Sequence, residues 1–218
     1  CEKLANVLGM IIGDGGFWAR KNSNRLISTF TTGDDELKDL FCNHIKELFN
    51  VEPRIKWEDT RWRVHLPSDI IVKWFVKTFD FHVGNTAKIK FIPPQIMKSP
   101  KSVVSSFIRG LFDTDGCASK DGSNIIYVTT SSTLARQVHE LLLKFGIISS
   151  LKIVKSKIED NKIVEKPYVE DPNSLGVVNF KIDMINCNYK VNIQIDRSKL
   201  FALLFKKNIK CSFEPCAR

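Results

Sequence analysis

A nine-residue pattern occurs twice in this chain of 218 residues and constrains its fold more than any other feature. Val7–Gly15 and Ile108–Gly116 each read as an apolar helical stretch with glycine at the third position and Asp-Gly at the end. The carboxylates of the two copies, Asp14 and Asp115, are separated by about half the chain. Repetition of this kind predicts a duplicated structural unit.

The glycines of the two copies predict how these helices pack. A helix with Gly9 or Gly110 in place of a bulky residue can press its backbone against a second helix. We expect Gly15 and Gly116 to turn the chain sharply out of each helix by adopting a positive φ. A pair of such helices would lie side by side with their C-terminal ends together.

That packing would also bring Asp14 and Asp115 together. Two adjacent carboxylates repel each other, and here both also face the negative ends of helix dipoles, so they need a cation. Carboxylate and carbonyl oxygens suit hard divalent ions such as Mg²⁺. Either copy alone is more typical of a buried helix and a turn, whereas the repetition favours metal-dependent phosphodiester chemistry.

The charge of the chain predicts its partner. A formal charge of +9 and 43% hydrophobic residues indicate a folded protein that binds a polyanion, most simply nucleic acid. An acidic membrane surface is the competing interpretation, but the sequence has no long apolar span, basic amphipathic helix or secretory leader. We therefore expect an intracellular protein without a membrane partner. Its six cysteines and four histidines show no metal-ligand spacing, and the cysteines are expected to be reduced.

Hydrophobic periodicity predicts an α+β fold with the order helix, two strands, helix, two strands, helix in each half. In the first half we expect helices at 4–13, 37–49 and 70–79 and strands at 17–21, 25–32, 54–57 and 61–66. In the second half we expect helices at 103–114, 134–145 and 198–205 and strands at 125–130, 151–155, 179–185 and 189–195. The expected organisation is a repeat at 1–80, a linker at 81–102 that prolines interrupt, and a repeat at 103–218. An insertion near 157–176 would form a long hairpin or a flexible loop.

Alternation along the strands predicts one face that packs on helices and one that binds DNA. Trp62, Val64 and Leu66 alternate with Arg61, Arg63 and His65, for example, and Ile55 and Trp57 with Arg54, Lys56 and Glu58. Arg, Lys, Asn and Gln on such a face suit phosphates and base edges, although an ordinary solvated face is the alternative. The candidate DNA-binding residues are Arg20, Arg25, Thr29, Thr31, Arg54, Lys56, Arg61, Arg63, His65, Lys120, Tyr127, Thr129, Lys152, Lys190, Asn192 and Gln194.

The repeated motif resembles that of the LAGLIDADG homing endonucleases, and the resemblance covers nearly the whole chain. The second copy matches at Gly110, Leu111, Asp113, Asp115 and Gly116, and the first copy keeps Gly9, Asp14 and Gly15. The resemblance implies two pseudo-symmetric αββαββα repeats, a central pair of motif helices and saddle-shaped antiparallel sheets that lie in the major groove. It further implies a monomer that cuts both strands of a long, pseudo-palindromic DNA target and leaves short 3′ overhangs.

The resemblance also implies the members of the active site. Asp14 and Asp115 would bind Mg²⁺, or Mn²⁺ or Ca²⁺ in its place, with the backbone carbonyls of Gly13 and Thr114 as further ligands. Asp113 precedes the second carboxylate by two residues and should not share its direction.

A lysine is also implied. Intein members of the family carry a lysine shortly before an Ile-Pro pair, as in Lys90-Phe91-Ile92-Pro93, so Lys90 is a candidate catalytic residue. Lys210 is its candidate counterpart after allowance for the insertion. The alternative is that Lys90 is one of many surface lysines.

Several assignments stay open at this level. The enzyme can be intron-encoded or the endonuclease domain of an intein; splicing by this chain itself is not expected, because its last residues lack the His-Asn pair that protein splicing uses. A nuclease-inactive relative acting as an RNA-splicing maturase or a DNA-binding protein is an alternative function. An unrelated basic binding protein is a further one.

Overall fold

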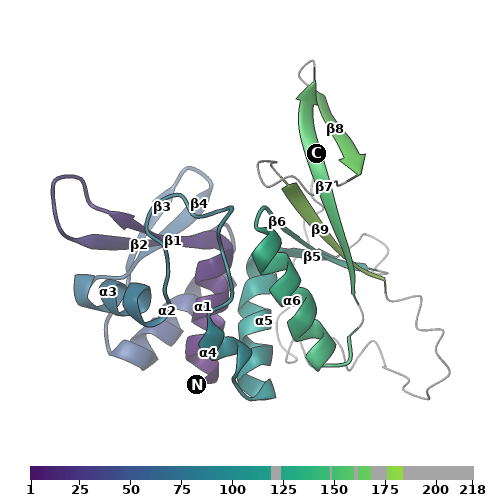
Figure 1. Ribbon diagram of the computed structural model, residues 1–218. Coiled ribbons are helices and arrows are strands. Elements are labelled where there is room, and N and C mark those ends of the chain that lie inside the picture. Colours follow the sequence, from purple (N-terminus) through teal and green to yellow (C-terminus); the bar gives the residue numbers. More distant parts are fainter. Residues whose placement is uncertain (119–123, 148, 160–161, 168–175, 184–218) are drawn as a thin grey trace. The chain divides into compact units, whose positions relative to one another are not determined.

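The computed structural model describes residues 1–118, 124–147, 149–159, 162–167 and 176–183, and it divides the chain into two compact units, Cys1–Asp115 and Gly116–Arg218 (Figure 1). Both units combine helices with an antiparallel sheet, which confirms the predicted α+β class. The first unit contains both motif helices.

The first unit follows the predicted order of elements. Its helices are α1 (Glu2–Asp14), α2 (Asp35–Phe49), α3 (Asp69–Thr78), α4 (Pro94–Met97) and α5 (Lys101–Asp115). Its strands are β1 (Gly15–Ala19), β2 (Leu26–Thr32), β3 (Arg54–Glu58) and β4 (Arg61–His65), in the sheet order β1-β2-β4-β3. Two helices begin at side-chain caps, because Asp34 accepts a hydrogen bond from the backbone N–H of Leu37 and Ser68 one from that of Ile71.

The core of this unit lies between one face of the sheet and the helices. Phe30 of β2 stacks on Phe41 of α2 with ring centroids 4.3 Å apart, and both rings are buried. Phe17 of β1 stacks on Phe75 of α3, and Val64 of β4 is also buried. The opposite face of the sheet, here called the open face, carries the residues that alternate with these.

The second unit has the sheet order β5-β6-β9-β7-β8. Its elements are β5 (Gly116–Ala118), β6 (Asn124–Thr129), α6 (Ser132–Lys144), β7 (Ser150–Glu159), β8 (Lys162–Pro167) and β9 (Gly176–Asp183). Part of the region expected to be an insertion forms β8, which pairs antiparallel with β7. The strand predicted at 189–195 and the helix predicted at 198–205 lie outside the described residues.

Three local expectations are wrong, each for a physical reason. Gly15 has an extended backbone, with φ −112°, and it is glycine because a Cβ there would lie only 2.7 Å from the Cα of Ile11. Pro94 does not interrupt regular structure but begins α4, since the first helical position needs no N–H donor. Ile55 and Trp57 are 47% and 50% exposed, because β3 is the edge strand and its apolar side chains are only partly covered.

Candidate active site and nucleic-acid interface

Helices α1 and α5 lie in backbone contact along their length (Figure 1). A Cβ on Gly9 would overlap the carbonyl oxygen of Phe107, and a Cβ on Gly110 would overlap that of Asn6. The amide of Asn6 donates a hydrogen bond of 3.0 Å to the carbonyl oxygen of Ser106, which ties the two helices together at the same level. The structure therefore confirms that Gly9 and Gly110 allow the backbones of the two motif helices to pack closely.

Both helices end at the motif aspartates, and the environment there disfavours their charge. Asp14 is exposed to solvent on one side and Asp115 is half-buried. Burial, and then the charge of Asp115, raise the pKa of Asp14 to about 6, against the opposing effects of Lys90 and Arg61. Burial also raises the pKa of Asp115, and Lys90 opposes this shift. The two carboxyl groups therefore interact as the sequence predicted.

Lys90 reaches the same place from the segment between the two motif helices. Its Nζ donates a hydrogen bond of 2.5 Å to the carbonyl oxygen of Gly13, in the last turn of α1. Burial lowers the pKa of Lys90, while Asp115 and Asp14 raise it. One ammonium group thus lies within the field of both carboxylates and holds a carbonyl that the sequence analysis assigned to a metal.

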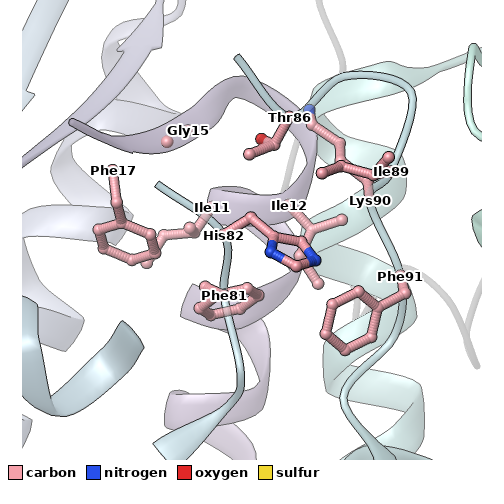
Figure 2. A pocket seen from close by; sticks show the side chains of 11 residues that line it. Ile11, Ile12, Gly15, Phe17, Phe81, His82, Thr86, Ile89, Lys90 and Phe91 are labelled. Carbon is pink, nitrogen blue, oxygen red and sulfur yellow. The ribbon is translucent and has the colours of Figure 1, made fainter. Parts of the chain in front are cut away.

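Lys90 also lines a small cavity, as Figure 2 shows. Its volume is about 30 Å³, and apolar side chains such as Ile11, Phe17 and Phe91 form most of its wall, with His82 and Thr86 beside them. A space of this size holds about one water molecule and no nucleotide. The segment that carries Lys90 packs on the apolar side chains of this wall, whereas the carboxylates lie at the ends of the helices.

Arg61 is a member of this site that sequence analysis placed only among the DNA-binding residues. Its guanidinium lowers the pKa of Asp14, so the two charges are close enough to interact. The cause is strand register: Thr32 of β2 pairs with Trp62 of β4, which places Arg61 beside the end of β2. Neither the pairing of β2 with β4 nor its register can be inferred from alternation alone.

The open face of the first sheet brings together most of the DNA-binding candidates of this unit. Strand register aligns Thr31, Arg63 and Lys56 across β2, β4 and β3. Arg54 pairs with His65 in the same way, and Glu58 with Arg61. Thr29 lies on β2, while Arg20 and Arg25 are exposed and flank the turn of the β1–β2 hairpin. These residues make the open face largely polar.

Three polar contacts on the open face are already made within the protein. Glu58 forms ion pairs with Lys56 at 2.9 Å and with Arg63 at 3.0 Å, and these cations lower its pKa. The Nδ1 atom of His65 lies 2.5 Å from the carbonyl oxygen of Ser28. Arg54 and Arg61 therefore carry more of the surface's free hydrogen-bonding capacity than Lys56, Arg63 and His65 do.

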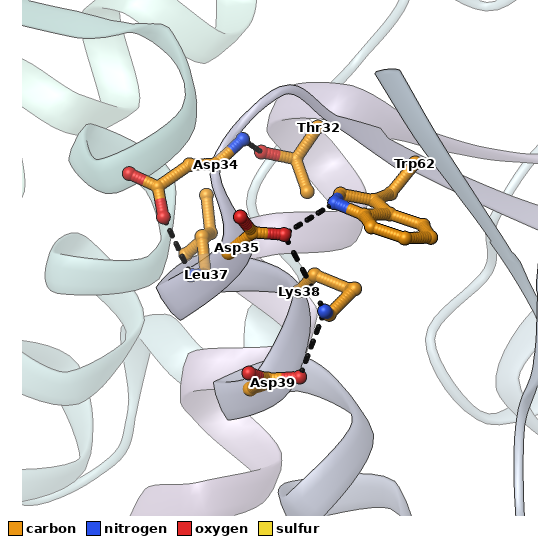
Figure 3. Close-up of polar contacts among 7 residues, drawn as sticks. All are labelled: Thr32, Asp34, Asp35, Leu37, Lys38, Asp39 and Trp62. Atoms are coloured by element: carbon orange, nitrogen blue, oxygen red, sulfur yellow. Dashed lines mark hydrogen bonds and ion pairs between the residues drawn. The ribbon is translucent and has the colours of Figure 1, made fainter. Parts of the chain in front are cut away.

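The opposite side of β4 is anchored to the beginning of α2, as Figure 3 shows. The indole N–H of Trp62 donates a hydrogen bond of 2.6 Å to Asp35, and the ammonium of Lys38 lies 4.4 Å from the centre of the indole ring. Lys38 also forms ion pairs with Asp35 and Asp39. This anchoring fixes the alternation of β4, so that Arg61 and Arg63 project from the open face.

The second unit corrects two of the predicted DNA contacts. Tyr127 and Thr129 of β6 are 0% and 7% exposed, so their side chains belong to the core, whereas Val128 between them is 40% exposed. The sequence of β6 is apolar on both faces, and alternation therefore could not identify the buried one. Lys152 lies in β7, but its side chain is not described. Lys120, Lys190, Asn192, Gln194 and Lys210 lie outside the described residues.

Asp113 and Thr114 are neighbours of Asp115, and both make contacts within α5. Asp113 forms an ion pair of 3.4 Å with Arg109, one turn earlier on α5, in keeping with its exclusion from the metal site. Thr114 is adjacent to Asp115, and its hydroxyl donates to the carbonyl oxygens of Leu111 and Gly110.

No group of three or more His, Cys, Asp or Glu side chains suited to a metal is present in the described part of the chain. A divalent ion here would instead be held by two carboxylates and helix-end carbonyls, a donor set that fits it.

The geometry has clear counterparts among solved structures. The fold matches the crystal structure of I-DmoI in complex with DNA and Mn with a TM-score of 0.61, at 19% identity over 95% of this chain and 98% of that chain. It also matches mesophilic variants of the homing endonuclease I-DmoI with a TM-score of 0.55, at 20% identity over 83% and 88% of the two chains. Residues 102–177 match the model of the LAGLIDADG-like domain. This chain contains a LAGLIDADG-like domain.

Curated relatives of this chain carry the matching segment within much longer proteins. It is 32% identical over 177 residues to the replication factor C small subunit of Methanocaldococcus jannaschii, covering 80% of this chain and 9% of that protein. It is 32% identical over 176 residues to the replicative DNA helicase DnaB of Synechocystis sp., covering 73% and 19%. A glutamine–fructose-6-phosphate aminotransferase of M. jannaschii is 28% identical over 176 residues, covering 79% and 15%. The chain spans less than a fifth of each of these relatives.

The described helices include none that is both long enough and apolar enough to cross a membrane.

Proposed function

We propose that this chain is a homing endonuclease that makes a site-specific, divalent-metal-dependent double-strand break in a long DNA target and leaves short 3′ overhangs. One observation carries the proposal. Two aspartates from distant copies of one motif interact at the ends of two closely packed helices, and Lys90 lies within the field of both. When the pKa values of two adjacent carboxyl groups are both raised, their ionised forms are disfavoured, and a bound cation stabilises them.

The roles of the residues follow from this arrangement. Asp14 and Asp115 hold the divalent ion, with the carbonyls of Gly13 and Thr114 available as further oxygen ligands. Bound there, Mg²⁺ supplies charge that polarises a phosphodiester and lowers the pKa of water. Lys90 and Arg61 stabilise negative charge that develops on the phosphate, because preorganised cations at a partly water-excluded site act strongly. The lowered pKa of Lys90 also suits it to exchange a proton with water.

The open face of the first sheet is proposed to bind the DNA. Its Arg and Lys side chains match phosphates and guanine edges, and β-strands can enter the major groove. The I-DmoI structures with a similar fold are complexes with DNA and divalent ions, which supports the same partner here. The two repeats would each contact one half of a pseudo-palindromic target, so that a monomer suffices. A DNA substrate also implies action inside the cell.

The relatives support a module carried within host proteins. Segments similar to this chain form 9–19% of proteins whose names share no activity: a replication factor C small subunit, a replicative DNA helicase and an aminotransferase. A segment shared by such different proteins behaves as an insertion that moves independently of its host. This favours an intein-type endonuclease over an intron-encoded one.

The decisive experiment is Mg²⁺-dependent cleavage of a plasmid that carries the uninterrupted host sequence across the insertion point. We expect cuts at one site with short 3′ overhangs. Asp14→Asn and Asp115→Asn should bind the same DNA and fail to cut it, while Asp69→Asn, on α3, should cut normally. Unchanged cutting by either motif variant would remove the metal assignment. Specific binding by the wild type without cutting would establish the maturase or DNA-binding alternative.

The role of Lys90 has its own test. Lys90→Met should slow cleavage about 100-fold, the effect of removing one preorganised charge from a reacting group, with little change in DNA affinity. Lys88→Met is the matched control, because Lys88 lies two residues earlier and is exposed. Equal rates for the two variants would show that Lys90 is a surface lysine without a catalytic role.

A further inference from the structure

An apolar pair interrupts the otherwise polar open face of the first sheet. Trp18 of β1 and Ile27 of β2 are cross-strand neighbours, and they are 42% and 40% exposed. Phe17, the residue before Trp18, is 2% exposed on the helix-covered face, so strand alternation directs Trp18 to the open face. Thr29 and Thr31 continue that face along β2, and Arg20 and Arg25 end it at the hairpin.

The Trp18 side chain lies close to the residue two before it. A Cβ added to Gly16 would lie 3.4 Å from the indole Nε1 of Trp18 and 3.8 Å from two of its ring carbons. The indole therefore lies over Gly16, back along β1 toward Asp14. A Cβ at position 16 would be in van der Waals contact with the ring. The exposed aromatic ring therefore covers the open face at Gly16.

Trp18 and Ile27 are only partly covered by the rest of the protein. Trp62, by comparison, is paired with Asp35 and Lys38, and Trp74 packs edge-on against Phe75. Trp18 and Ile27 keep about two fifths of their surface in water, between hydroxyl-bearing and cationic neighbours. An exposed apolar patch rimmed by polar residues is typical of a binding surface.

We propose that Trp18 and Ile27 form a contact site for the 5-methyl group of a thymine in the major groove, and so select T over C at one base pair of the target. The proposal rests on the proposed function, which places the open face against DNA. Base edges in the major groove are otherwise donors and acceptors, and the thymine methyl is the apolar group that they offer. The cations at the hairpin end complement the adjacent phosphates.

The structure also places this base pair along the target. Trp18 follows Asp14 by four strand residues, which span at most about 13 Å. Successive base pairs are about 3.4 Å apart, so the selected thymine lies within about four base pairs of the cut in the half-site that the first unit contacts.

The test begins with a pool of random DNA duplexes selected for binding in Ca²⁺. Wild type should select a sequence with T at one position near its centre, and Trp18→Ala should lose the preference at that position alone. Trp57→Ala is the matched control, because Trp57 is also half-exposed but belongs to the opposite face. Its selected sequence should equal that of the wild type.

Four duplexes that carry T, U, C or 5-methylcytosine at that position then isolate the methyl group. Wild type should bind T about fourfold more tightly than U, and 5-methylcytosine about fourfold more tightly than C, as expected for one buried methyl. Both differences should shrink toward unity in Trp18→Ala and in Ile27→Thr. Equal binding of T and U by the wild type would overturn the proposal without requiring any variant to fold. Selection of no sequence by the wild type would instead overturn the proposed function.

Discussion

The carboxyl groups of Asp14 and Asp115 are held where the folded chain disfavours their negative charge. Burial raises the pKa of both, and Asp14 also feels the charge of Asp115. Lys90 and Arg61 offset only part of this, because the pKa of Asp14 remains at about 6. Without a divalent ion, the ionised pair therefore destabilises the protein, and the site trades stability for chemistry.

Substitution of Asp14 by Asn should raise the stability of the metal-free protein at neutral pH. The folded-state pKa of about 6 exceeds the ordinary aspartate pKa of 3.8, so the folded protein binds more protons than the unfolded chain between these values. Stability from this group is therefore largest below pH 3.8 and falls as the pH rises to about 6. Asp14→Asn removes that fall. Thermal unfolding in EDTA from pH 4 to 8 measures both effects.

Asp69→Asn is the control with the opposite sign. An ion pair with Lys73, and then a hydrogen bond from the backbone N–H of Leu26, lower the pKa of Asp69. Its contribution is present above the unfolded pKa and is lost as the pH falls through the folded one. Asp69→Asn should therefore lower the melting temperature at pH 7. A decrease for both variants would show that Asp14 is stabilising.

At the level of single residues, the repeated motif predicts that Asp14 and Asp115 lie together, and the structure brings their charges together. Their role in metal binding and catalysis stays a prediction. Arg61 was assigned to DNA binding alone, because its approach to Asp14 depends on the register between β2 and β4. Tyr127 was placed on the wrong face, because β6 is apolar on both sides and alternation carries no information there.

At the scale of elements, the interface between α1 and α5 depends on two positions without a side chain. Gly110→Ala should lower the free energy of unfolding by about 3 kcal/mol or more, because its Cβ would overlap a backbone oxygen of α1 that cannot move alone. Urea unfolding measures this change. Gly33→Ala is the control, since the nearest atom to its added Cβ is 3.7 Å away, and it should change stability by less than about 0.5 kcal/mol. Equal losses would contradict close helix packing.

The bounds of the helices and strands in the first unit were predictable to within a few residues, but the burial of their side chains was not. Alternation assigned Ile55 and Trp57 to the same side of the sheet as Trp62 and Val64, and the register agrees. It could not show that β3 is the edge strand, so the two residues were expected to be buried and are half-exposed. The short helix α4 was missed because Pro94 interrupts a helix only in its interior.

At the scale of the whole molecule, the charge of +9 identifies a polyanionic partner but does not locate it. The described strands β1 to β4 concentrate part of this charge on the open face, where Glu58 is flanked by Lys56 and Arg63. Two of the cations that would contact phosphates are therefore partly neutralised before DNA arrives. These ion pairs are exposed and contribute little to folding, so their loss should leave stability nearly unchanged.

Glu58→Gln should strengthen DNA binding and make it more sensitive to salt. The substitution removes one negative charge from the open face and frees Lys56 and Arg63 for phosphate contacts. Each added contact steepens the slope of log K against log salt by about 0.9. Binding to a mixed-sequence duplex between about 50 and 200 mM salt therefore should show a slope steeper by about 1 to 2 units. Glu52→Gln is the matched control, because Glu52 also pairs with a lysine, Lys46, but precedes β3 and is outside the sheet. An unchanged slope in Glu58→Gln would show that phosphates do not contact this part of the open face.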